Sequence, residues 1–164
     1  QSREIIGAEV VAKGSGGGAG SWLLDPRNMT SSDAVTANGS FNGANPNLFT
    51  PTADDAVVSR DTIQTSLNND TDVTMQTTGG DTTLAGNVTF GAQINKSSEG
   101  TATLRVDADG TITVDKPITS QTGTLNIDFN ATTGVLVDAD ITTNGGRFHS
   151  DGTTFSQTDN TIST

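Results

Sequence analysis

Two alternating stretches decide the fold, Thr101-Ala-Thr-Leu104-Arg-Val106 and Gly123-Thr-Leu-Asn-Ile127-Asp-Phe129. In each of them apolar side chains alternate with Thr, Arg, Asn or Asp. This is the pattern of a strand with one face in a core and the other in water. The piece between them, Thr111-Ile-Thr-Val114, alternates in the same way, and turn dipeptides such as Asp109-Gly110 separate the pieces. We therefore expect short strands joined by tight turns.

Apolar positions also recur along the chain about every 21 residues. Such a period, with three short strands in it, is too short for a pair of helices and fits one coil of a parallel β-solenoid. The sequence thus predicts an all-β fold, a β-helix with coils of about 21 residues. The predicted core stack consists of Ile63, Leu84, Leu104, Leu125 and Phe148, together with Ile118, Ile141 and Ile162. Two further series support the period, Val73 with Ile94, and Ile112 with Val135 and Phe155.

The composition agrees with a narrow core. Hydrophobic residues make up only 31% of the 164 residues, and a β-solenoid fills its core with the inward side chains of each strand alone. The net charge of −11 makes nucleic acid and anionic membrane surfaces poor partners. No apolar run approaches the roughly 18 residues of a membrane helix. The lack of cysteine excludes disulfides and thiolate metal sites.

Two segments stand apart from the repeat. In 61–68, Ile63 and Leu67 lie four positions apart behind a possible Asp61 cap, which predicts a short helical turn. The segment 31–55, with Pro46 and Pro51, is expected to form a loop excursion, under which Trp22 closes the core. Taken as a whole, the sequence predicts a single β-helix segment, 1–164, without a polar cap at either end. Exposed strand edges would then let the segment associate with itself, as part of a longer fibre.

Several motifs resemble the filamentous haemagglutinin-like adhesins that bacteria export by two-partner secretion. The segment Gly20-Ser-Trp-Leu-Leu-Asp-Pro-Arg-Asn-Met-Thr30 is similar to the family's Gly-x-Trp-Leu-Leu-Asp-Pro segment. Residues 61–74 resemble its Ile-x-x-x-Leu-Asn-x-Gly-x-x-Val segment, although Asp70 replaces the usual Gly. Residues 108–118 and 135–148 resemble its coil repeats. The likeness covers most of 4–164 apart from the excursion.

This resemblance implies a right-handed parallel β-helix exported through an outer-membrane transporter and displayed on the bacterial surface or secreted. It further implies a structural and adhesive function in cell adhesion, aggregation or biofilm cohesion, rather than an enzyme. The expected partners are a host or bacterial cell-surface receptor or glycan, and further parts of the fibre. No cofactor, no membrane insertion and no nucleic acid are expected.

Two groups of residues are candidates for a chemical function. His149 is the sole imidazole and follows Phe148 on an alternating strand, so it should face solvent. Asp138 and Asp140 lie two positions apart on one face, as do Asp107 and Asp109. Such pairs are common in turns, but they could bind calcium or serve a polysaccharide lyase or hydrolase that uses an acidic outer face. We expect structural turns and assign no catalytic, cofactor or metal residue, with the carbohydrate-active β-helix as the alternative function.

Overall fold

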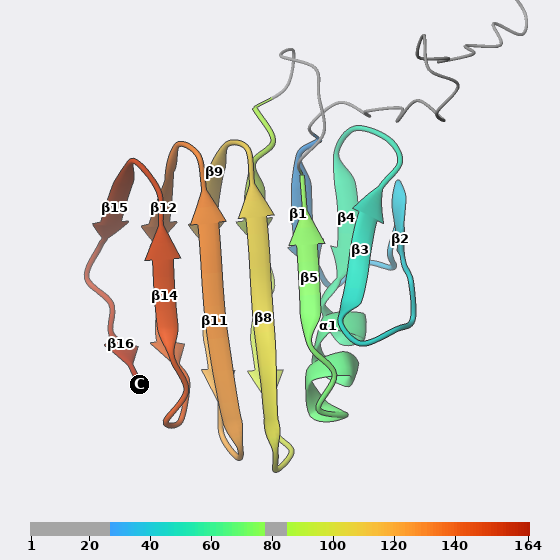
Figure 1. Ribbon diagram of the computed structural model, residues 1–164. Helices are drawn as coiled ribbons and strands as arrows, with labels where there is room; N and C mark the ends of the chain where they lie inside the picture. Colours follow the sequence, from blue (N-terminus) through green and yellow to red (C-terminus); the bar gives the residue numbers. More distant parts are fainter. Residues whose placement is uncertain (1–26, 78–84) are drawn as a thin grey trace, which may run out of the picture.

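The computed structural model describes residues 27–77 and 85–164, which form the predicted parallel β-solenoid (Figure 1). The chain winds repeatedly through three sheets, and successive coils pair in parallel. Leu84 and Trp22 lie outside the described residues. No described helix is long and apolar enough to cross a membrane.

The three sheets have the following strands in spatial order. The first sheet contains β4 (Ala56–Ser59), β1 (Met29–Ser32), β6 (Val88–Phe90), β9 (Thr111–Val114), β12 (Gly134–Val137) and β15 (Thr154–Gln157). The second contains β7 (Ile94–Lys96), β10 (Ile118–Ser120), β13 (Ile141–Thr142) and β16 (Ile162–Ser163). The third contains β2 (Gly39–Phe41), β3 (Asn47–Pro51), β5 (Val73–Gln76), β8 (Thr101–Ala108), β11 (Thr124–Ala131) and β14 (Phe148–Asp151).

Two of the predicted stacks are confirmed. Ile118 pairs with Ile141 in the next coil, and Ile141 pairs with Ile162. The series Ile112, Val135 and Phe155 is likewise in register. Because the paired strands are parallel, these side chains lie above one another along the core.

The register of the third sheet corrects the other predicted stack. Leu104 pairs with Ile127, 23 positions later, and Ile127 pairs with Phe148. Leu125 is buried but pairs with Ala102, so it is displaced by one inward position from the predicted stack. Leu125 and Ile127 are both apolar and inward, and a spacing of apolar residues cannot distinguish them.

The predicted pairing of Val73 with Ile94 is also wrong. Val73 belongs to β5 in the third sheet and pairs with Leu104, whereas Ile94 belongs to β7 in the second sheet. Ile63 lies in a helix and not in a strand, although its side chain is buried in the same core. The spacing of apolar residues therefore predicts that these side chains are buried, but it does not predict to which sheet or helix each of them belongs.

The one described helix, α1 (Arg60–Asn68), confirms the predicted helical turn. It stands beside β7, where the second sheet would otherwise continue with another strand, and buries Ile63 and Leu67 against the core. The prediction that Asp61 caps this helix is wrong. The N-cap position is Ser59, which makes no side-chain capping bond, and Asp61 lies in the first turn.

The segment 31–55 was expected to be a loop, but it also contains strands. It includes β2 and β3 and the end of β1. β3 adds to the third sheet in parallel with β5, and β2 adds in the antiparallel sense. Phe49 is fully buried, and the Asn47 Nδ2 donates to the Ser66 Oγ at 2.9 Å, so the core accepts this segment.

One corner of the solenoid is lined with buried polar side chains from successive coils. Lys96 is fully buried, and its Nζ donates to the carbonyl oxygens of Ser98 at 2.8 Å and Glu99 at 3.1 Å. The next rung is Ser120, whose hydroxyl donates to the Gly123 carbonyl oxygen, and the next is Thr143. Each side chain therefore satisfies the carbonyl groups of the turn that follows its own strand.

Candidate functional site

The outer surface of the third sheet carries a network of ion-paired side chains. We call the outward side chains of β5, β8, β11 and β14 the polar face; these strands lie side by side in Figure 1. Parallel register places its residues in rows across the coils. One row consists of Thr74, Arg105, Asp128 and His149, and the next consists of Gln76, Asp107, Asn130 and Asp151.

Asp128 is the centre of the first row. Its side chain is only 16% exposed, and its Oδ1 lies 2.8 Å from the Nδ1 of His149. Its Oδ2 lies 3.7 Å from Arg105 Nη1 and 3.8 Å from Arg147 Nη2. One carboxylate thus joins basic side chains from the coils on both of its sides.

Asp107 links the two rows. Its carboxylate accepts from the Arg105 Nε at 2.9 Å and from the Asn130 Nδ2 at 2.9 Å. The hydrogen bonds and charge of Asp107 raise the pKa of Arg105 above its ordinary value, aided by the charge of Asp128 and opposed by burial. Arg105 consequently stays charged at any physiological pH.

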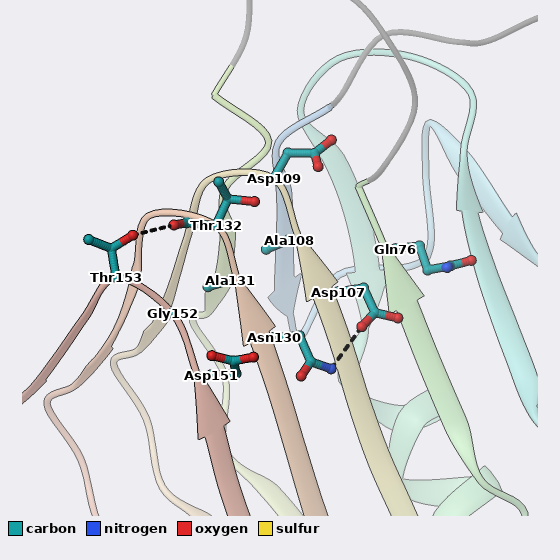
Figure 2. A pocket seen from close by; sticks show the side chains of 10 residues that line it. All are labelled: Gln76, Asp107, Ala108, Asp109, Asn130, Ala131, Thr132, Asp151, Gly152 and Thr153. Atoms are coloured by element: carbon teal, nitrogen blue, oxygen red, sulfur yellow. Dashed lines mark hydrogen bonds between the residues drawn. The ribbon is translucent and has the colours of Figure 1, made fainter.

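A hollow of about 670 Å³ lies where the polar face meets the turns that follow its strands. Figure 2 shows Asp107, Asn130 and Asp151 on neighbouring strands along it, with Asp109 and Thr132 at the turns. Ala108, Ala131 and Gly152 also line the hollow. The hollow is therefore polar, with several oxygen acceptors and a net negative lining.

The structure brings together only some of the residues that the sequence singled out. Asp107 and Asp109 both line the hollow. Asp138 and Asp140 instead lie exposed in the connection between β12 and β13, and the Asp140 Oδ1 accepts from the Thr161 backbone N–H at 2.8 Å. The interpretation of Asp140 as a turn residue fits this bond.

His149 faces outward, as predicted, but it is not simply solvated. Its side chain is half-exposed and is held by Asp128 in the preceding coil. Sequence reasoning missed this partner because it compared His149 only with its neighbours in sequence. The coil period could have identified this partner, since Asp128 and His149 lie 21 positions apart, which is the predicted length of a coil.

Among residues 27–77 and 85–164, no three His, Cys, Asp or Glu side chains are grouped so that they could hold a metal ion. Neither protein-family models nor curated proteins gave a match to this chain.

Proposed function

We propose that this chain is a structural and adhesive segment of a bacterial surface fibre. The observation that carries the proposal is the pairing of outward polar side chains between coils, of which Asp128 with Arg105 and His149 is the central case. Side chains that are held by their neighbours in this way stiffen an extended column. A β-solenoid of this kind supports a long and regular surface.

Adhesion by such a column is mechanical and multivalent. Weak contacts with a cell-surface receptor or glycan repeat along the coils, and their effect adds through effective concentration. On this proposal the chain is secreted through an outer-membrane transporter and acts at the cell surface, as the resemblance to filamentous haemagglutinin-like adhesins implies.

The experiment is the adhesion of beads coated with the chain to bacterial and host cells. Dense beads should bind, and sparsely coated beads should bind far less, because multivalent binding depends steeply on density. Beads coated with an unrelated acidic protein of equal charge provide the control. Equal binding by the beads that carry the chain and by the control beads, or no binding by either, would contradict the proposal.

A carbohydrate-active β-helix is the second candidate, and the hollow favours it. Asp109 and Asp151 line the hollow, and none of the described residues forms an ion pair with either. The Asp128–His149 pair lies in the adjoining row and could orient the imidazole as a general base. Such an enzyme would cleave a polysaccharide lying along the polar face.

Depolymerisation assays on a panel of polysaccharides separate the two candidates. If the chain is an enzyme, activity should be lost in Asp109→Asn, Asp151→Asn and His149→Asn. The double variant Asp138→Asn, Asp140→Asn should keep that activity, because its residues lie away from the hollow. The absence of cleavage by the wild-type chain would leave the adhesive proposal in place.

A further inference from the structure

The first sheet differs from the third in its charges. Its described strands, β4, β1, β6, β9, β12 and β15, contain no Asp, Glu, Lys, Arg or His. The polar face, by contrast, carries Arg105, Asp107, Asp128, His149 and Asp151. In Figure 1 the first sheet lies behind the polar face. A chain with a net charge of −11 therefore has one wall whose strands are uncharged.

One outward side chain from each strand of the first sheet lies in a single row across the coils. Its members are threonine, serine, valine or leucine, and each is exposed or half-buried. We call this set the uncharged row; it consists of Val57, Thr30, Thr89, Thr113, Leu136 and Ser156. Successive members are one strand spacing apart, about 4.8 Å. The row is therefore regular, and it combines methyl groups with small hydroxyls.

We propose that the uncharged row is an interaction surface for a second copy of the chain, packed side by side with the first. Two acidic chains repel one another where their charged surfaces meet, and this sheet lets them approach with its charge-free strands. The second copy also repeats its side chains at the same spacing. Each member of the row thus meets an equivalent member, whereas a partner with another period falls out of step.

A two-fold axis parallel to the column gives this arrangement. It sets each coil against the same coil of the second copy and reverses the direction of the strands, so the interface is closed. Asp115 and Asp138 are exposed and directly follow β9 and β12, at one margin of the sheet. The reversal places them beside Thr111 and Gly134, the uncharged starts of the same strands in the second copy. The acidic margins of the two copies therefore do not meet.

This contact uses outward side chains and no free strand edge. Because it runs parallel to the column, additional coils lengthen it without changing its geometry. Side-by-side packing of this kind is compatible with a column of any length, and it supplies a surface for the aggregation that the proposed function includes.

The row is short in this chain. Six strands about 4.8 Å apart, each contributing roughly three residues of about 3.3 Å, cover ~300 Å² of each copy. A stable complex buries about 800 Å² on each partner. Two separate chains should therefore associate weakly, and the contacts of successive coils add in a longer column. That addition rests on the proposed fibre, whereas the pairing of the chain itself does not.

Static light scattering of the chain at concentrations up to about 1 mM, in low and in high salt, tests this inference. We expect reversible self-association that rises when salt screens the net charge. Thr113→Lys and Leu136→Lys each place an ammonium group in the contact and should lower the association constant at least about tenfold. Both changes also reduce the net negative charge, which by itself would favour association. Circular dichroism checks that each variant is folded.

Thr103→Lys is the matched control, because Thr103 is half-buried on the polar face and the change alters the net charge equally. It should leave association unchanged or slightly stronger. A chain that stays monomeric in high salt, an equal loss in Thr103→Lys, or no loss in the two folded variants of the row would overturn the inference. None of these outcomes depends on adhesion to cells, so failure here is distinct from failure of the adhesive proposal.

Discussion

The side-chain Oδ1 of Asn68 in helix α1 accepts hydrogen bonds from the backbone N–H of Ser97 at 2.8 Å and of Ser98 at 3.2 Å. This side chain thereby accepts hydrogen bonds of the kind that the backbone carbonyl groups of a neighbouring strand accept elsewhere in the second sheet. Together with Gln64 one turn earlier, it satisfies backbone donors at and just beyond the edge of β7.

Asn68→Ala should lower the free energy of unfolding by ~1–2 kcal/mol, because it leaves two backbone donors without their acceptor. Thr65→Ala is the control on the same helix, since Thr65 is exposed, and it should change stability by less than about 0.5 kcal/mol. Urea unfolding followed by circular dichroism measures both. Equal stability of the two variants would show that the contact between α1 and the edge of β7 does not depend on this bond.

Leu104→Asp should unfold the central coils. Leu104 is fully buried between Val73 and Ile127, and an unpaired charge there should cost at least about 3 kcal/mol. Thr101→Asp, on an exposed position of the same strand, should cost less than about 0.5 kcal/mol. If thermal melting gave both variants the wild-type Tm, Leu104 could not be a core residue.

Lys96→Met tests the polar corner. Methionine fills a similar volume, but it cannot donate to the carbonyl oxygens of Ser98 and Glu99. We expect a loss of ~2–3 kcal/mol, from those bonds and from the acceptors left unpaired. The exposed Lys116→Met should be nearly neutral. A more stable Lys96→Met protein would mean that burial of the charge outweighs its hydrogen bonds.

Asp128→Asn tests the ionic contacts of the polar face. It preserves shape but removes the charge that faces Arg105, Arg147 and His149. We expect a loss of about 1 kcal/mol at low salt, because these partners are partly exposed, and a smaller loss in high salt. Asp138→Asn is the matched control. An effect of Asp128→Asn that did not change with salt would argue for packing and not for charge.

The sequence predicts the fold well where one apolar residue per strand defines the register. Ile118, Ile141 and Ile162 belong to such strands, and their stack is as predicted. In the longer β11, Leu125 and Ile127 are equally suited to face inward, and only the lengths of the turns decide that Ile127 lies beside Leu104. Turn lengths vary between coils, so a single fixed period cannot give every pairing.

The burial of β3 and the contacts of the polar face were harder to predict. β3 has only a few apolar residues within a stretch rich in Asn and Gly, and its burial depends on contacts such as Asn47 with Ser66. Asp128 and His149 meet through stacking alone. Such partners follow from the sequence only after the coil register is known.

Disulfide formation between introduced cysteines tests the coil register most directly, because the natural chain has no cysteine. In the structure Thr103 lies beside Asn126, one strand spacing away. Thr124 comes two residues before Asn126 on the same strand, which places it about 8 Å from Thr103. Thr103→Cys with Asn126→Cys should therefore crosslink rapidly on mild oxidation, and Thr103→Cys with Thr124→Cys should not. Preferential crosslinking of the second pair, or of neither pair in a folded chain, would contradict the stacked solenoid described above.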